Sequence, residues 1–530
     1  MTKKDDSVDG EQQPLLGNDD HQYTKRSVKG KELFLIQVAI FSNVFLVGFD
    51  GTFTASTYTT IGNDFNASHM APWVTTSYLI TATVFQSLYG SFSDVLGRKI
   101  VLTMATATFG LGTLGCGLAP TMFTLNLMRA VAGCGGAGLT TMATIINSDI
   151  ITDKRRGIFQ AIQIVLNSFG GVLGASLGGF MAENIGWRWS FLIQVPVCCI
   201  NLVTGYLFVI DQEFLDEERK KNWTSSIDFK GAITLVCGLT MQISALSVGG
   251  NEWAWSDYRT FSLIGLGCIF LIIFYRIELS ASAPVMPVKM ITGTIPPLLL
   301  LANFFLGLAA YSYIFMLPLY FQAVLKDSPS QAGLRFMIPS MSTPVGGVIT
   351  GLLMARVKNL AKVFSAGAAL IAVGSWLVIV TSRFSEHWWY NVLLVPANIG
   401  QGLAFPASLF TFIRVFTPEN HAVATSIAAL YRSLGQICGV AVGSAIVQNV
   451  LAAELPSRLG SSPETRDLIQ RIRHSFSTIN TLPQDIQRIV RDIYANAIST
   501  SFIVASAIAI LSCLITLIIG IRKHNQPIKI

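Results

Sequence analysis

Charged residues are scarce in this chain of 530 residues, because Asp, Glu, Lys and Arg make up only 13% of it. Soluble globular proteins carry about 25% charged residues, so this composition excludes an ordinary soluble enzyme. Apolar residues make up 51% of the chain. At about 20 apolar residues per transmembrane helix, that share supplies about a dozen spans or more, which excludes a protein with a single membrane anchor.

The chain also lacks the residue groups on which most catalytic and metal-binding sites depend. Its 8 cysteines all lie inside apolar runs, which argues against a disulfide framework or a zinc site. No phosphate-binding loop, nucleophile elbow or metal-ligand spacing of His, Cys and Asp occurs at a predicted membrane face. We therefore expect no enzyme activity, no cofactor, no metal site and no ATP-driven pumping.

Long apolar runs predict an all-α, polytopic membrane protein with about fourteen transmembrane helices. Each run extends over roughly 18 to 28 residues, enough to cross a hydrocarbon core about 30 Å thick. The runs begin near Leu33, Trp73, Ile100, Met122, Ile158, Trp189, Phe229, Thr260, Pro296, Gly333, Val363, Trp389, Val423 and Ala497.

The basic residues indicate how these helices are oriented. Lys and Arg gather in alternate loops, on the side that also holds both ends of the chain, whereas only about four lie in the short loops of the other side. The positive-inside rule therefore places both termini in the cytosol. The net charge of +7 then reflects orientation and calls for no nucleic acid or other anionic partner.

Weak internal repeats divide the chain. The segment 90–99 recurs in degenerate form at 351–362, and the glycine spacing of 170–178 recurs at 435–443, so both offsets are about 260 to 265 residues. We predict a disordered cytosolic tail at 1–32, a six-helix bundle at 33–210, a linker with two inserted helices at 211–295, a second six-helix bundle at 296–521 with a long non-cytosolic loop at 451–496, and a cytosolic tail at 522–530. Within that loop, apolar residues at helical spacing in 463–476 and 483–494 predict short surface helices.

GSFSDVLGRK, at 90–99, is the most specific motif in the chain. Gly90 permits close helix contact and Gly97 makes a turn. Asp94 stands at a helix end, where it can pair with Arg98 or with a neighbouring bundle. The motif resembles G-x-x-x-D-x-x-G-R-K, which joins helices 2 and 3 in the major facilitator superfamily. The resemblance implies a gate whose contacts hold one conformation closed on the cytosolic side, formed by Gly90, Asp94, Gly97, Arg98 and Lys99.

GGVLGASLGG, at 170–179, resembles the antiporter motif G-x-x-x-G-P-x-x-G-G of the same superfamily. Ala175 stands where the motif has proline, so the bend that proline would give is in doubt and the antiporter inference is weakened. Tight helix packing alone also explains these glycines. The glycines concerned are Gly170, Gly174, Gly178 and Gly179.

Further segments resemble the fourteen-span drug:proton antiporter group of the superfamily. They are FDGTFTAS around Asp50, WVTTSYL at 73–79 and WRWSFLIQVP at 187–196, and LNLMRAVAGCGGAG at 125–138 resembles the helix 4 motif of the superfamily. With the predicted spans, the resemblance covers nearly the whole chain. It implies the major facilitator fold, with two six-helix bundles and two inserted helices.

Asp50 and Arg129 are the most deeply placed opposite charges of the first bundle. Each lies about eight residues from the non-cytosolic end of its helix, so both lie roughly 12 Å below the same membrane face. A charge inside the membrane is costly and marks a functional site. We hypothesise that the two side chains face a shared cavity and that protonation of Asp50 switches their pairing, which couples proton flow to substrate exchange. A static ion pair is the structural alternative.

The second bundle holds further polar residues in or near its spans. Asn303, Asn398 and Gln401 are candidates to line a cavity, although hydrogen bonds between helices also explain them. Arg432, in YRSLGQICG, is equally compatible with a structural and a substrate-facing role. Asn66 begins an N-x-S sequon in the first non-cytosolic loop and is a candidate glycosylation site.

EQQPLL, at 11–16, has the form of an acidic dileucine sorting signal read by an adaptor, with Glu11, Leu15 and Leu16 as its defining residues. Together with the segments around Asp50 and at 187–196, it makes the chain resemble fungal vacuolar amino acid transporters, particularly the basic amino acid group. The resemblance implies a protein of the vacuolar membrane that imports lysine, histidine or arginine, and some neutral amino acids, in exchange for protons. We expect a monomer whose partners are the amino acid, protons, the lipid membrane and the adaptor.

Two other functions remain open. A multidrug:proton exporter of the plasma membrane uses the same fold with a broader, more apolar pocket. An amino acid sensor would bind the same ligands without moving them, but sensors often carry long cytosolic extensions. The predicted tails here cover only about 32 and 9 residues, which favours transport.

Overall fold

The computed structural model describes residues 30–65, 73–151, 153–209, 228–249, 257–281, 284–327, 341–357, 359–381, 389–416, 420–460, 463–474 and 482–521, with Trp253, Arg335, Pro339 and Ile479. The elements within these ranges are helices, apart from an isolated bridge between Gly249 and Trp253. The predicted all-α class is confirmed.

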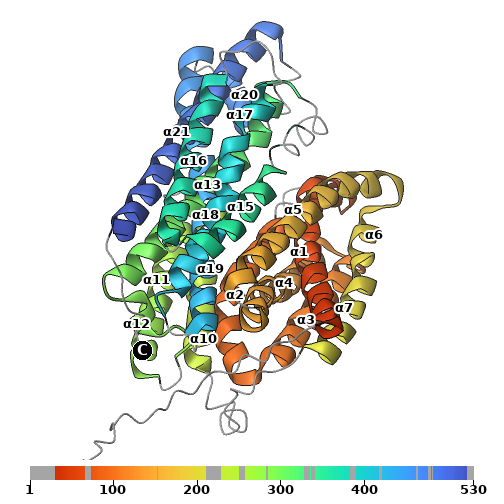
Figure 1. The fold of residues 1–530 in the computed structure, drawn as a ribbon. Helices are drawn as coiled ribbons and strands as arrows, with labels where there is room; N and C mark the ends of the chain where they lie inside the picture. The colour runs from red at the N-terminus through yellow and green to blue at the C-terminus, as the bar shows by residue number, and fades with distance from the viewer. Residues whose placement is uncertain are drawn as a thin grey trace, which may run out of the picture.

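A first group of helices packs into one body, which we call the N-bundle (Figure 1). Within it α1 packs on α5, α2 on α4, and α3 on α4 and α7. Its members are α1 (Lys31–Asp64), α2 (Trp73–Leu96), α3 (Arg98–Gly117), α4 (Met122–Ile150), α5 (Asp153–Asn184) and the consecutive α6 (Trp187–Leu192) and α7 (Gln194–Phe208).

A second group forms the C-bundle, coloured green to blue in Figure 1. Here α13 packs on α19 and α21, and α16 packs on α18 and α21. Its members are α13 (Ile295–Ala323), α15 (Ser342–Arg356), α16 (Leu360–Thr381), α17 (Trp389–Leu393), α18 (Val395–Ile413), α19 (His421–Leu459), α20 (Pro463–His474) and α21 (Gln484–Ile521).

The middle of the chain forms a helical hairpin of α10 (Phe229–Val248) and α11 (Tyr258–Ser280), followed by the short α12 (Val288–Ile291). The Asp228 carboxylate caps α10 by accepting a hydrogen bond from Gly231 N at 2.8 Å, as the first turn of a helix requires. α10 contacts α2 of the N-bundle and α19 of the C-bundle as well as α11. The hairpin therefore bridges the two bundles.

The segment that follows α11 folds back onto the N-bundle. The buried Glu278 carboxylate accepts a hydrogen bond from Met286 N, and Val285 O accepts one from the Ser91 hydroxyl of α2 at 2.8 Å. Because Ser91 lies in the 90–99 motif, the inserted hairpin is attached directly to that motif.

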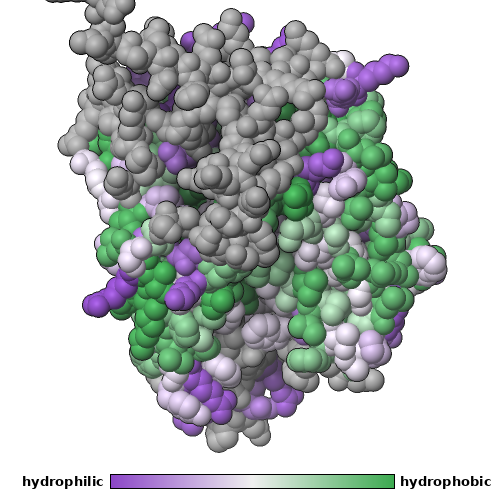
Figure 2. Space-filling model, turned by 90° about the horizontal axis from the view of Figure 1, so that it is seen from below, coloured by the Kyte–Doolittle hydropathy of each residue, from purple (hydrophilic) through white to green (hydrophobic). Residues whose placement is uncertain are grey.

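The molecule has two distinct ends. At one end Gly97 turns the chain between α2 and α3 with a φ of 95°, a value that glycine adopts without strain. We call this the Gly97 end, and Figure 2 views the molecule from it. The opposite end carries α20 and is called the α20 end (Figure 1).

Eleven helices of the described chain are long and apolar enough to cross a membrane. α2, α4 and α15 pack among them. Large apolar side chains point outward, since Leu111, Phe123 and Phe261 are 66%, 70% and 62% exposed. Apolar residues cover wide areas of the coloured surface in Figure 2. Such exposure suits a surrounding of lipid, because water would make it costly.

Most helices begin within a few residues of the predicted positions, and the predicted start at Gly333 lies outside the described residues. The short helices predicted at 463–476 and 483–494 match α20 and the start of α21. The clearest difference in this segment is that the neighbouring spans continue into it as unbroken helices. α19 continues to Leu459 and α21 already begins at Gln484, with α20 between them. Polar residues interrupt the apolar run there, yet Leu455, Ile472 and Tyr494 are buried in one shared cluster that stabilises these helical extensions.

Candidate functional site

Asp50 and Arg129 form an ion pair inside the N-bundle. Arg129 Nη1 donates to Asp50 Oδ2 at 2.7 Å, and both side chains are 0% exposed. α1 supplies the carboxylate and α4 supplies the guanidinium. Such a pair offsets the cost of burying two charges only when its geometry is good, and removal of one partner is strongly destabilising.

The Arg129 side chain makes more contacts with residues outside the pair than the Asp50 side chain does. Arg129 Nε donates to the Val74 carbonyl at 3.0 Å, and the guanidinium carbon lies 4.4 Å from the ring centroid of Tyr78. Both residues belong to α2. Asp50 Oδ1 and Arg129 Nη2 make no hydrogen bond to any part of the chain that the structure describes. The pair thus keeps one unused acceptor and one unused donor.

The pairing brings together two residues that the sequence singled out by depth, although one step of that estimate was wrong. α1 continues to Asp64, well past the end that was assumed about eight residues after Asp50. The end of α1 was placed too early because the sequence before Asp64 is rich in threonine and lacks the hydropathy of a membrane span. The two residues meet because the helices pack side by side, and the proposed switch between them stays a prediction.

The 90–99 motif forms a polar cluster at the Gly97 end. Arg98 donates from Nη1 to Asp94 Oδ1 at 2.6 Å and from Nε to Asp149 Oδ2 at 2.9 Å. Asp94 lies in the last turn of α2 and Asp149 in the last turn of α4, so Arg98 holds these helix ends together. Lys99 Nζ lies 4.5 Å from the ring centroid of Tyr206. Sequence patterns gave no signal for Asp149, which follows an apolar run without a motif.

The two bundles meet through closely spaced backbones. A Cβ atom on Gly90 of α2 would lie 2.8 Å from the Ala422 carbonyl oxygen of α19. A Cβ atom on Gly157 of α5 would lie 2.8 Å from the Gly351 carbonyl oxygen of α15. These separations are too short for any side chain larger than hydrogen, so both contacts depend on glycine.

A hydrogen bond between the bundles lies nearer the middle of the molecule. Ser433 of α19 donates to Gln86 Oε1 of α2 at 2.8 Å. This hydrogen bond and the glycine contacts join the two bundles over the part of the molecule that extends from its middle to the Gly97 end. Figure 1 shows the bundles adjacent at α2 and α19 and diverging toward the α20 end. In this conformation the Gly97 end is closed.

The glycines of 170–179 pack α5 against α1. A Cβ atom on Gly174 would lie 3.0 Å from the Phe49 carbonyl carbon, and one on Gly170 would lie 3.1 Å from Phe49 N. Gly178 is buried on the same helix, and Gly179 follows it in α5. In the C-bundle, Gly435 and Gly439 of α19 meet the α13 backbone in the same way. The same glycine-mediated contact thus occurs once in each bundle.

Two of the three polar amide candidates of the C-bundle, Asn303 and Asn398, tie its helices together. The Ser408 hydroxyl of α18 donates to Asn303 Oδ1 of α13 at 2.9 Å, and Thr343 of α15 donates to Asn398 Oδ1 of α18 at 3.4 Å. Gln401 is buried, and its Nε2 makes no hydrogen bond within the described residues. Interhelical hydrogen bonding accounts for Asn303 and Asn398.

Arg432 lies apart from these ties. It stands on α19 beside Ser433, and its guanidinium carbon is 5.3 Å from the ring centroid of Phe405. The remaining sequence candidates, Asn66 of the sequon and Glu11, Leu15 and Leu16 of the sorting signal, lie outside the described residues.

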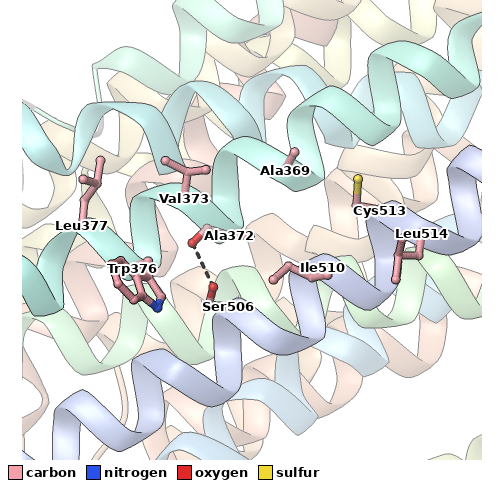
Figure 3. Close-up of a pocket in the computed structure, with 9 residues that line it drawn as sticks. All are labelled: Ala369, Ala372, Val373, Trp376, Leu377, Ser506, Ile510, Cys513 and Leu514. Atoms are coloured by element: carbon pink, nitrogen blue, oxygen red, sulfur yellow. Dashed lines mark hydrogen bonds between the residues drawn. The ribbon is translucent and has the colours of Figure 1, made fainter.

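A cavity of about 360 Å³ lies between α16 and α21, far from the ion pair in sequence (Figure 3). The Ser506 hydroxyl donates to Ala372 O at its wall at 3.0 Å, so this polar group is already satisfied. The rest of the wall is apolar, which distinguishes the cavity from the polar sites above. The lining residues are Ala369, Ala372, Val373, Trp376, Leu377, Ser506, Ile510, Cys513 and Leu514.

Comparisons with known proteins agree with the fold and the motifs. The chain is 37% identical over 465 residues to vacuolar basic amino acid transporter 2 of Saccharomyces cerevisiae, covering 86% of this chain and 97% of that protein. It is 33% identical over 497 residues to multidrug resistance protein fnx1 of Schizosaccharomyces pombe, covering 92% and 93%. Among solved structures, the human organic anion transporter MFSD10 matches with a TM-score of 0.60 at 14% identity, covering 92% of this chain and 100% of that one.

The relative named as vacuolar and the apolar helices together support a multi-pass protein of the vacuolar membrane. The sequence model of the Major Facilitator Superfamily matches residues 40–440, which is most of the chain. The chain therefore belongs to the major facilitator superfamily and is a membrane transporter of that type.

Proposed function

We propose that the protein moves amino acids, basic ones in particular, from the cytosol into the vacuole in exchange for protons. The observation that carries the proposal is the fully buried ion pair of Asp50 and Arg129, a protonatable carboxylate held against a fixed cation inside the membrane. The relative named as a vacuolar basic amino acid transporter supports the choice of substrate.

Protonation of Asp50 would remove the negative charge that balances Arg129. Arg129 would remain attached to α2 through the Val74 carbonyl and the Tyr78 ring, so the change falls mainly on α1, which carries Asp50. α1 packs on α5, and α5 contacts α15 of the C-bundle at the Gly97 end. A change in the attraction between α1 and α4 can therefore shift α1, then α5, and so alter the contact of α5 with α15 that closes this end.

On the orientation given by the basic loops, the Gly97 end faces the cytosol and the α20 end faces the acidic lumen. Asp50 lies in the lumenal half of this arrangement, because Arg129 is only seven residues, about 10 Å, from the start of α4. Protons from the lumen would neutralise Asp50, weaken the closed state and allow the cytosolic end to open. The described structure corresponds to the conformation closed toward the cytosol.

The test is uptake of labelled lysine, arginine and histidine into vacuolar vesicles energised with ATP, with and without a proton uncoupler. Asp50→Asn should reduce ATP-driven uptake to the level seen with the uncoupler. Counterflow of labelled against unlabelled amino acid should persist, because it needs no net proton movement. Asp64→Asn is the matched control on the same helix, since the ion pair of Asp64 with Arg188 is exposed to solvent and contributes little.

Removal of one partner of a buried ion pair destabilises a protein by about 3–5 kcal/mol, so the amount of folded protein must be measured in each vesicle preparation. The double variant Asp50→Asn with Arg129→Gln removes both charges and should recover stability but not ATP-driven uptake. Full ATP-driven uptake by folded Asp50→Asn would contradict proton coupling through this residue.

Export of drugs is the second candidate, favoured by the 33% identity to multidrug resistance protein fnx1. It predicts that deletion of the gene raises drug sensitivity and leaves vesicle uptake of every amino acid unchanged. The vacuolar uptake assay and a drug-sensitivity assay on the same strains separate the two functions.

A further inference from the structure

Arg432 is a positive charge near the middle of the membrane. It lies eleven residues after His421, the first residue of α19, which corresponds to about 16 Å from the Gly97 end. A hydrocarbon core is about 30 Å thick, so this residue is close to its midplane. Substrate sites of secondary transporters lie near this depth, at the interface between the bundles.

Arg432 has no acidic partner within the described residues, whereas Arg129 inside the N-bundle and Arg98 of the 90–99 motif each have one. Arg98 and Arg129 each contact a carboxylate oxygen, at 2.6 and 2.7 Å. The neighbours of Arg432 are the Phe405 ring and Tyr311, which interacts with it electrostatically. An aromatic ring covers one face of a guanidinium and leaves its hydrogen-bonding edge free.

The position of Arg432 is at the junction of the bundles. Its neighbour Ser433 donates to Gln86 of the N-bundle, while Tyr311 and Phe405 come from α13 and α18 of the C-bundle. The Arg432 side chain is partly exposed, whereas Arg129 is completely buried. A guanidinium without an acidic partner at this place is suited to bind an anion from outside the chain.

We propose that Arg432, with Tyr311 beside it, binds the α-carboxylate of the transported amino acid. This assignment rests on the proposed function. A guanidinium matches a carboxylate with two parallel hydrogen bonds. The Tyr311 hydroxyl makes no hydrogen bond within the part of the chain that the structure describes, so it is free to donate a third.

The assignment gives the site a basis for selectivity. Every amino acid has the α-carboxylate, so Arg432 does not discriminate between lysine, arginine and neutral amino acids. It discriminates between an amino acid and a compound that has the same side chain without the negative charge. A cationic drug or the methyl ester of lysine would leave Arg432 unbalanced and add a second positive charge to the site.

The test compares uptake of lysine and lysine methyl ester by vacuolar vesicles. The unaltered protein should prefer lysine by about 10- to 100-fold in kcat/KM, the range expected for charged hydrogen bonds. Arg432→Gln should reduce this preference to about twofold or less, mainly through a higher KM for lysine, and Arg432→Lys should retain part of it. Arg488→Gln, which alters an exposed arginine of α21, should keep the full preference.

The ratio of the two substrates does not depend on the amount of folded protein. A purely structural role of Arg432 would lower uptake of both compounds equally. If Arg432→Gln does not reach the vesicles, Tyr311→Phe replaces it and should lower the preference by about 2- to 10-fold. Retention of the full preference by the folded variants would overturn the assignment while leaving amino acid transport intact. Absence of amino acid uptake by the unaltered protein would overturn the proposed function and this assignment together.

Discussion

Substitution of Gly351 by alanine tests whether the glycine contact between α5 and α15 holds the Gly97 end closed. A Cβ atom at this position would lie 2.6 Å from the Gly157 carbonyl oxygen and 2.9 Å from its carbon. Both of these neighbours are backbone atoms, which cannot rotate away. The two helices would have to separate, and overpacking of this kind costs about 1–3 kcal/mol.

The cost applies only while the bundles are in contact, so it lowers the population of the closed conformation relative to the open one. A difference of about 1–3 kcal/mol corresponds to a change of about 5- to 150-fold in that ratio. We therefore expect Gly351→Ala to favour the conformation that is open at the Gly97 end without unfolding either bundle.

A cross-link across the bundle interface measures this population. Gln86→Cys with Ser433→Cys replaces two side chains that are hydrogen bonded at 2.8 Å in the closed state. The initial rate of disulfide formation with a mild oxidant should fall in Gly351→Ala in proportion to the closed population. Gly347→Ala is the matched control on the same helix, because its Cβ atom would meet Ile164 Cδ1 at 3.4 Å, an ordinary contact. Equal cross-linking rates in both variants and in the protein with glycine at both positions would refute the reasoning.

Two further predictions concern packing within the protein. Gly174→Val should lower the thermal stability of the purified protein in detergent by the equivalent of about 1–3 kcal/mol, because the new side chain would meet the Phe49 backbone of α1; unchanged stability would show that α1 and α5 can separate freely. Glu278→Ala should lower it by about 1–3 kcal/mol, because the buried N–H of Met286 loses its acceptor, whereas Glu278→Gln, which keeps an acceptor oxygen, should lose less; equal losses in the two variants would assign the effect to charge.

Much of the architecture could be predicted because lipid imposes simple rules on sequence. A span must be apolar and about 20 residues long, so the starts of most helices are visible in hydropathy alone. The rule fails where helices leave the membrane. Helical spacing predicts the short helices in 451–496, but the continuation of α19 and α21 through this segment depends on packing around Leu455 and Tyr494, and packing between distant residues has no local sequence pattern.

The residues of the candidate site could be predicted from the sequence, but their contacts could not. Charges are rare in spans, so Asp50 and Arg129 could be identified by depth without knowledge of the helix packing. Their mutual contact, and the roles of Asp149 and Gln86, depend on which helices are neighbours. Arg432 could be placed in a span from the sequence, but only the structure distinguishes an arginine with an acidic partner from one without.

The inserted hairpin of α10 and α11 also limits the motion that this protein can make. It contacts α2 in one bundle and α19 in the other, and the segment after α11 is attached to α2 through Ser91 and Val285. When the Gly97 end opens, α2 and α19 move apart, and the hairpin must lose its contact with one of them or follow both. Opening of the Gly97 end therefore requires the packing of the hairpin against one bundle to change, in addition to the direct contacts between the bundles.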